Sequence, residues 1–237
     1  MTEWYNYTDG DVLDLDRKSP ADFIDEIKMD YLRPYLPSNG VILEVGAGSG
    51  RLLTRIGLEN NYTVIGIDQS QKSTKIIRTS QQKFNLNGAS INGTAFQIPL
   101  KDNSIDVVCS GGLLEHFNRR EIYIVLKEMN RVLKEDGFLY ADIVPQKRSL
   151  CRPFIRKTAW GYENDYDNIT WDYFLCRNGF KGIIFRGLVL PPDFYGRWTG
   201  KKRIQFMYKH KDFIKSLDNT FLSNWLGFAY FVFAKKR

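Results

Sequence analysis

The sequence predicts an α/β protein with a mostly parallel β-sheet whose two faces are covered by helices. Three observations support this fold class. Short apolar runs typical of buried strands alternate with longer segments of helical periodicity. A glycine-rich turn joins the first apolar run to a helix. The 237 residues are 43% apolar and 26% charged, which excludes a disordered chain and gives enough length for a core without disulfides.

The first predicted element is an amphipathic helix over 19–36. Ser19 suits an N-cap, and Pro20 suits the first helical position. Apolar side chains recur every four residues from Phe23 to Tyr31. One face of this helix is therefore expected to enter the core.

The elements that follow alternate between strands and helices. Strands are expected where the runs are short and apolar, at 41–46, 63–68, 90–96, 105–110 and 137–143. Helices are expected between them at 50–59, 70–86 and 120–136, and the last of these is expected to stop at Gly137. Beyond this regular part we expect a helix at 170–180 that ends at Gly179, and two more strands at 182–190 and 228–236.

These elements fit one domain over residues 1–237, because the chain has no internal repeat and no linker rich in Pro, Gly or Ser. Three less regular stretches, at 1–18, 145–169 and 191–225, are expected to be elaborations of that domain.

The charge of the chain is unevenly distributed. Residues 1–145 contain 16 Lys and Arg against 20 Asp and Glu, a net of −4, whereas residues 146–237 contain 18 against 7, a net of +11. The basic part also contains four of the five tryptophans, Trp160, Trp171, Trp198 and Trp225. This combination suits nucleic acid, an anionic small substrate or an acidic membrane surface, and it equally suits a solubilising surface over an ordinary core.

The cysteines and the apolar runs indicate a soluble, cytoplasmic protein. Cys109, Cys151 and Cys176 are odd in number and have no metal-ligand spacing, so reduced thiols are expected. The acidic, aromatic N-terminal stretch differs from a secretory signal. The longest apolar run, near 226–234, is too short for a membrane-spanning helix.

A first motif, ILEVGAGSGRL at 42–52, places three glycines between a strand and a helix. Gly46, Gly48 and Gly50 permit a tight turn and let a ligand approach the backbone closely. The helix that follows offers free N–H groups at its start. The alternative is a turn that merely packs the helix on the strand.

Two acidic residues narrow the kind of ligand. Asp68 ends the second strand, 24 residues after Glu44, where a carboxylate can accept hydrogen bonds from both ribose hydroxyls of an adenosine cofactor. Glu44 lies two residues before the turn, where its charge disfavours a pyrophosphate and suits a ligand that carries positive groups. The GxGxG spacing also differs from the GxGxxG of dinucleotide-binding enzymes.

With these motifs the sequence resembles the class I S-adenosylmethionine-dependent methyltransferases, close to the group that acts in ubiquinone and menaquinone biosynthesis. ILEVGAGSGRL resembles the first family motif, VIGID at 64–68 the second, and GTAFQIPLKDNSIDVVCSGGLLEHF at 93–117 the third. The resemblance covers about residues 30–145, which it implies to be the cofactor-binding core, and more loosely the last strand. It implies a Rossmann-like, doubly wound sheet of seven strands with an antiparallel last strand, and S-adenosylmethionine as the cofactor.

The resemblance also implies which residues bind the cofactor. Asp68 would hold the ribose with Gln69 beside the adenine, while Ser110 and Gly111 would contact the methionine part and face the methyl group. Thr94 stands where the family often has Asp, and its hydroxyl can still accept a hydrogen bond from the adenine, without charge. The full implied set, in which Ala95 and Phe96 flank the adenine and the three glycines surround the methionine part, is Glu44, Gly46, Ala47, Gly48, Gly50, Asp68, Gln69, Thr94, Ala95, Phe96, Ser110 and Gly111.

His116 is the candidate general base, because it lies on a loop next to the expected methyl position. The alternative is a structural imidazole that bonds the backbone where LEHF opens a helix. A metal site is not expected, since metal-using relatives have a further Glu where this chain has Gly112. Asp142, at the end of the fifth strand, could act as a base or cap a turn.

The acceptor of the methyl group is expected to be recognised by the three elaborations, which would converge over the strand ends. Their aromatic and basic side chains suit an aromatic, lipid-like or anionic metabolite; they are Trp4, Tyr5, Tyr7, Arg148, Arg152, Phe154, Arg156, Lys157, Trp160, Tyr162, Phe194, Tyr195, Arg197 and Trp198. The leading function is methyl transfer to a small molecule. Two alternative functions stay open: methyl transfer to RNA, DNA or another macromolecule, and non-catalytic binding of S-adenosylmethionine. Both a monomer and a homodimer are compatible with the sequence.

Overall fold

The structure, a computed structural model, describes residues 12–16, 18–143, 164, 166–189, 201–217, 223 and 227–237. Most of the three elaborations lies outside these residues, and so do all the aromatic and basic side chains that the sequence offers for recognition of the acceptor. Within the described residues no helix combines the length and the apolar character that a bilayer crossing requires.

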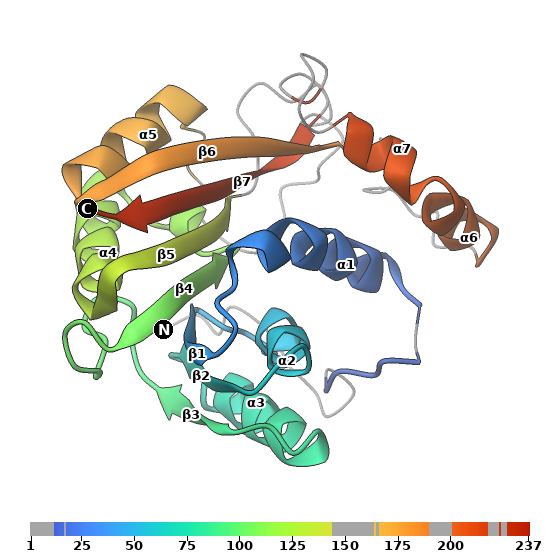
Figure 1. The fold of residues 1–237 in the computed structure, drawn as a ribbon, viewed down its shortest axis with the longest axis horizontal. Coiled ribbons are helices and arrows are strands. Elements are labelled where there is room, and N and C mark those ends of the chain that lie inside the picture. The colour runs from blue at the N-terminus through green and yellow to red at the C-terminus, as the bar shows by residue number, and fades with distance from the viewer. Residues whose placement is uncertain are drawn as a thin grey trace.

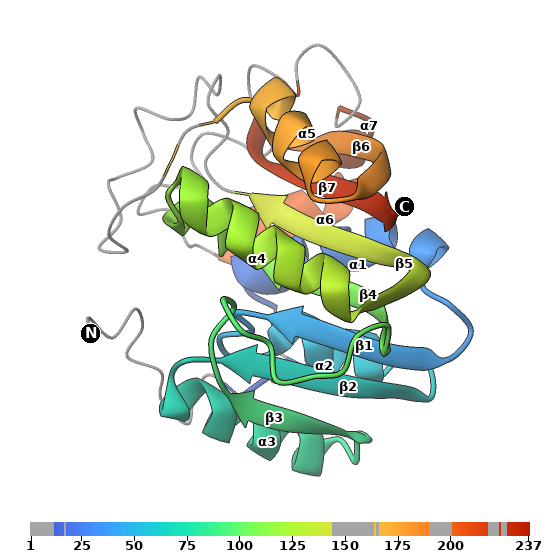
Figure 2. The same ribbon diagram turned by 90° about the vertical axis from the view of Figure 1, so that its left-hand side faces the viewer.

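Seven strands form one sheet in the order β3-β2-β1-β4-β5-β7-β6 (Figure 2). Their bounds are β1 (Gly40–Val45), β2 (Tyr62–Asp68), β3 (Gly88–Asn92), β4 (Ile105–Gly111), β5 (Leu133–Ile143), β6 (Phe180–Val189) and β7 (Gly227–Lys236). The pairings among β1 to β5 are parallel, and β7 runs antiparallel to both β5 and β6. The predicted fold class, the seven strands and the antiparallel last strand are confirmed.

Helices cover both faces of the sheet (Figures 1 and 2). The helices are α1 (Pro20–Leu32), α2 (Arg51–Gly57), α3 (Gln71–Lys83), α4 (Arg119–Val132), α5 (Asn168–Arg177), α6 (Lys201–Lys209) and α7 (Lys211–Ser216), with short 3-10 helices η2 (Arg33–Tyr35) and η3 (Leu114–His116). One apolar cluster lies between the sheet and α4 and α5. A second lies between the sheet and the layer of α1, α2 and α3.

The start of α1 follows the sequence pattern closely. The side chain of Ser19 accepts a hydrogen bond from the N–H of Asp22, and the Asp22 carboxylate accepts one from the N–H of Ser19. This reciprocal capping satisfies N–H groups that have no partner within the helix. Phe23 and Ile27 are fully buried, so the predicted apolar face does enter the core.

The predicted end of α4 is wrong. The helix ends at Val132 rather than near 136, and Leu133 already belongs to β5, where it pairs with Ile105 and is fully buried. Gly137 does not end a helix. It lies in a tight bend of the strand, where an added Cβ would be 2.7 Å from the carbonyl oxygen of Lys134. The glycine is therefore needed for close backbone approach.

The third strand is shorter than the predicted run at 90–96. It ends at Asn92, and residues 94 to 97 form a turn closed by a bridge between Thr94 and Gln97. Three of the residues implied to bind the cofactor, Thr94, Ala95 and Phe96, thus lie in a loop at the carboxyl edge of the sheet. In open α/β sheets this edge is where ligands bind, at the point where the strand order reverses. Here that point lies between β1 and β4.

Candidate functional site

A cavity of about 820 Å³ opens at the carboxyl ends of β1, β2 and β4. It is large enough for a nucleoside-sized ligand. Ten of the twelve residues implied to bind the cofactor line it: Glu44, Gly46, Ala47, Gly48, Asp68, Gln69, Thr94, Ala95, Phe96 and Gly111. His116 lines it as well, whereas Gly50 and Ser110 do not. Residues far apart in the sequence are thus brought to one place by the ends of three parallel strands.

The glycine turn between β1 and α2 is shaped by its contacts. Gly46 has φ +69°, and an added Cβ would lie 2.8 Å from the side chain of Leu113, which also lines the cavity. Gly50 has φ +67° and begins α2, where an added Cβ would lie 2.8 Å from Ile77. The first glycine therefore shapes the cavity, and the second packs α2 against α3. The N–H groups of Gly46 and Ala47 donate to the carbonyl of Ile67, which ties the turn to β2.

Asp68 connects the glycine turn after β1 with the turn after β2 at the edge of the cavity. One carboxylate oxygen accepts a hydrogen bond from the N–H of Gly48 at 2.8 Å, and the other accepts one from the N–H of Ser70 at 2.8 Å. A carboxylate oxygen can accept more than one hydrogen bond. The two backbone donors therefore fix the orientation of this carboxylate while it can still accept hydroxyl donors from a ligand.

The loop after β3 provides an aromatic wall. The rings of Phe96 and Phe117 meet edge to face with centroids 5.1 Å apart, and both residues line the cavity. The hydroxyl of Thr94 accepts a hydrogen bond from the N–H of Phe96 at 3.3 Å. Asn92 donates to the carbonyls of Asp68 and Gln69, so this loop and the end of β2 are held together.

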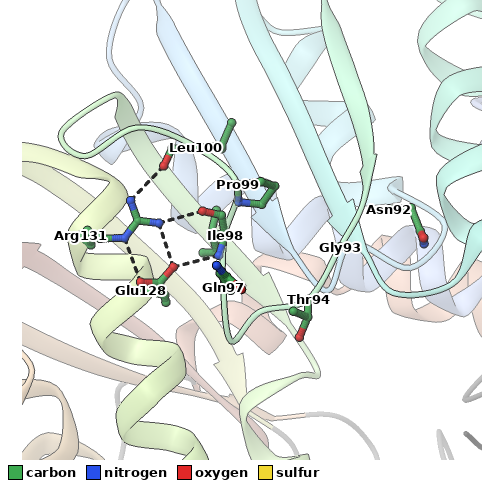
Figure 3. Close-up of a pocket in the computed structure, with 9 residues that line it drawn as sticks. All are labelled: Asn92, Gly93, Thr94, Gln97, Ile98, Pro99, Leu100, Glu128 and Arg131. Atoms are coloured by element: carbon green, nitrogen blue, oxygen red, sulfur yellow. Dashed lines mark hydrogen bonds and ion pairs between the residues drawn. The ribbon is translucent and has the colours of Figure 1, made fainter.

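A second hollow of about 530 Å³ lies behind the same loop (Figure 3). Its main feature is Arg131, which donates to the carbonyls of Ile98 and Leu100 and to the carboxylate of Glu128. Glu128 in turn accepts from the N–H of Ile98 at 2.9 Å. These polar groups form their hydrogen bonds with one another. We therefore interpret the cluster as a structural support for the loop that carries Thr94.

Buried charges line the end of the cavity near β1. Glu44 is only 5% exposed, and its carboxylate accepts from the N–H of Leu53 at 3.2 Å. Burial raises the pKa of Glu44 to about 8, although the positive charge of Lys28 opposes this shift. Lys28 forms an ion pair with Asp142. Burial acts to lower the pKa of Lys28, but Asp142 and Asp25 outweigh it and raise the pKa above its usual value.

The two α1 side chains in this cavity, Asp25 and Lys28, were not predicted from the sequence. They are three residues apart and so share one side of the helix. Charged residues on the solvent-facing side of a helix have the same spacing. Only the packing of α1 over the strand ends therefore shows that these two residues line a cavity. Arg51 fixes that packing, because it bonds Asp22 at 2.6 Å and Asp25 at 2.9 Å and so joins α1 to α2.

The remaining predicted residues are placed as follows. Ser110 is fully buried, and its hydroxyl has no hydrogen-bond partner among the described residues. Asp142 lies near the end of β5, and its carboxylate forms an ion pair with Lys28. His116 ends the short helix η3, which Asn164 holds by donating from its side chain to the carbonyl of Phe117 and from its backbone to Glu115.

Comparison with known proteins finds a domain match over part of the chain. Residues 43–141 match the model of a methyltransferase domain. An uncharacterized methyltransferase of Schizosaccharomyces pombe, C25B8.09, is 37% identical over 98 residues, which are 41% of this chain and 36% of that protein. An uncharacterized methyltransferase-like protein from the same organism, C25B8.10, is 29% identical over 140 residues, 59% of this chain and 50% of that protein. The chain thus spans half or less of the length of these curated relatives.

The similarity to solved structures extends over nearly the whole chain. The crystal structure of a methyltransferase from Thermotoga maritima, described as a possible histamine N-methyltransferase, aligns with a TM-score of 0.63 at 19% identity. The alignment covers 92% of this chain and 91% of that one. At this level of identity the similarity concerns the fold.

Proposed function

We propose that this chain is a class I, S-adenosylmethionine-dependent methyltransferase that transfers a methyl group to a small-molecule acceptor. The proposal is supported by the match of residues 43–141 to a methyltransferase domain and by the similarity to curated methyltransferases. One observation carries the proposal: ten of the twelve residues that the family motifs imply line a single cavity at the strand ends. A glycine turn that served only to pack a helix would not need the acid, the aromatic loop and the β4 turn at the same cavity.

The chemistry of the lining fits this cofactor. S-adenosylmethionine carries a methyl group activated by a sulfonium, together with an ammonium, a carboxylate and an adenosine. Asp25 and Lys28 supply both signs of charge at one end of the cavity, and the carboxyl of Glu44 adds a further polar group there, which suits a ligand with an ammonium and a carboxylate. Asp68 would accept hydrogen bonds from the ribose hydroxyls, and Phe96 would stack on the adenine.

The protein's own task is to align the acceptor with the methyl group and to exclude water. Phe96 and Phe117 form an apolar wall that supports both roles. His116 lines the same cavity, and we propose that it accepts the proton that the attacking atom loses. Three expectations from the sequence stay predictions. They are the subgroup that acts in quinone biosynthesis, a single catalytic domain over 1–237 with elaborations that select the acceptor, and a cytoplasmic location.

An aromatic, lipid-like or anionic metabolite is the acceptor class that we propose. A cavity of this volume with an aromatic wall favours a small molecule, and the basic second part of the chain favours a negative charge on it. That same basic part favours RNA or DNA as the second candidate acceptor.

The experiment combines two measurements on the full chain. Calorimetric titration with S-adenosylmethionine and S-adenosylhomocysteine tests binding, and transfer of a labelled methyl group to fractionated metabolites or to RNA tests the acceptor. The proposal expects binding of both ligands and label in a small molecule. Label in RNA, with a steep dependence on salt, would select the second candidate, and binding without transfer to any acceptor would select a non-catalytic role.

A further inference from the structure

The outer side of α6 and α7 exposes large aromatic side chains away from the cavity. Phe206 is 58% exposed and Phe213 is 64% exposed, while Met207 and Ile214 are buried in the core cluster under α1. The two helices therefore bury equivalent positions, seven residues apart, and expose the adjacent ones. Large aromatic side chains exposed at equivalent positions of neighbouring helices are a feature of interaction surfaces. Figure 1 shows that this pair of helices lies beyond α1, at the far end of the molecule from α5.

The charge of this segment is strongly positive. Residues 201–216 contain six Lys and Arg against one Asp, a net of +5. The inner lysines are neutralised by α1, because Lys211 lies 3.2 Å from Glu26 and Lys215 lies 3.0 Å from Asp30. Lys209 is exposed three residues after Phe206 on α6 and has no ion-pair partner among the described residues. Positive charge therefore remains for a partner outside the molecule.

We propose that the outer face of α6 and α7, defined by Phe206, Lys209 and Phe213, docks on an anionic lipid surface. Exposed aromatic rings that project from basic helices insert at the boundary between headgroups and acyl chains, and lysines there meet lipid phosphates. Each lysine or arginine near such a surface strengthens the electrostatic attraction to it.

Two other occupants fit this face less well. A second copy of the chain in a twofold arrangement would bring one basic segment against its equivalent, and like charges at an interface oppose association. A nucleic acid could bind the lysines through its phosphates. Its bases, however, stack on aromatic rings that line a basic groove, and the two phenylalanines lie on exposed helices instead. The proposal is independent of methyl transfer, since none of its three residues lines the cavity.

The test measures partition of the full chain onto sedimented vesicles. Vesicles of phosphatidylcholine with about 30 mol % phosphatidylglycerol should bind the protein, pure phosphatidylcholine should bind it at least about tenfold more weakly, and added salt should reduce the binding. The double variant Phe206→Ser/Phe213→Ser should lose at least about tenfold in partition. The matched control Ile169→Ser changes a side chain that is 71% exposed on α5 and should bind like the unchanged protein.

Three results would overturn the proposal. The first is equal partition of the double variant and the Ile169→Ser control. The second is binding that does not distinguish anionic from neutral vesicles. The third is self-association by sedimentation velocity that the double variant abolishes, which would assign the face to a second copy. Unchanged affinity of the double variant for S-adenosylhomocysteine, or an unchanged melting temperature, establishes that the variant is folded.

Discussion

Replacement of Asp68 by Ala should weaken binding of S-adenosylmethionine by a factor that the structure allows us to estimate. The carboxylate is held by the N–H groups of Gly48 and Ser70 and lines the cavity. If it accepts hydrogen bonds from both ribose hydroxyls, the variant loses two bonds to a charged group, each worth about 1.5 to 3 kcal/mol. A loss of about 3 to 6 kcal/mol weakens the affinity by about 10² to 10⁴.

Isothermal calorimetry of S-adenosylhomocysteine binding measures this loss without turnover. Asp172→Ala is the matched control, because it removes an exposed aspartate on α5, away from the cavity. A second variant, Asp68→Asn, keeps the size of the side chain and one backbone acceptor, and should bind with an affinity between those of the unchanged protein and Asp68→Ala. An Asp68→Ala variant that melts cooperatively and binds within about threefold of the unchanged protein would refute the ribose assignment.

Three further outcomes follow from the buried charges and from His116. The folded-state pKa of Glu44, about 8, lies above the value of 4.5 for an unperturbed glutamate, so the folded state keeps a proton that the unfolded state releases between these values. Stability should therefore fall as the pH rises from 5 to 8, by up to about 1.4 kcal/mol for each pH unit, and urea unfolding of Glu44→Gln should lack this component. Lys28→Met should destabilise the fold by about 3 kcal/mol in the same assay because Asp142 loses its partner, and Lys28→Met/Asp142→Asn should recover part of this loss; additive effects would contradict the pairing. His116→Gln should lower kcat by about 10² to 10⁴ and leave the calorimetric affinity for the cofactor unchanged, whereas an unchanged kcat would assign His116 a structural role.

The strand pattern and the glycine motif made most of the fold predictable. Each apolar run was short and bounded by polar or turn residues, so all seven strands could be placed within a few residues. The end of α4 could not be predicted, because Leu133 continues the helical periodicity of the preceding residues. Its burial against β4 depends on a tertiary contact. A periodic pattern does not distinguish a core position at the end of a helix from one at the start of the next strand.

The lining of the cavity was predictable where the residues lie in the motifs themselves. Gly50 and Ser110 belong to the same motifs but do not line the cavity, since an added Cβ at Gly50 would meet Ile77 and Ser110 is fully buried. Lys28 and Asp25 belong to no motif and reach the cavity only because α1 packs across the strand ends. Contacts of this kind depend on the position of a helix rather than on its local sequence, which is why the pairing of Lys28 with Asp142 was not expected.

A crystal structure of the full chain with S-adenosylhomocysteine bound tests the central assignment most directly. We expect the ligand in the cavity at the ends of β1, β2 and β4, with both ribose hydroxyls within hydrogen-bond distance of the Asp68 carboxylate and the sulfur on the side of His116. A ligand seated elsewhere, or a ribose that makes no contact with Asp68, would contradict the account.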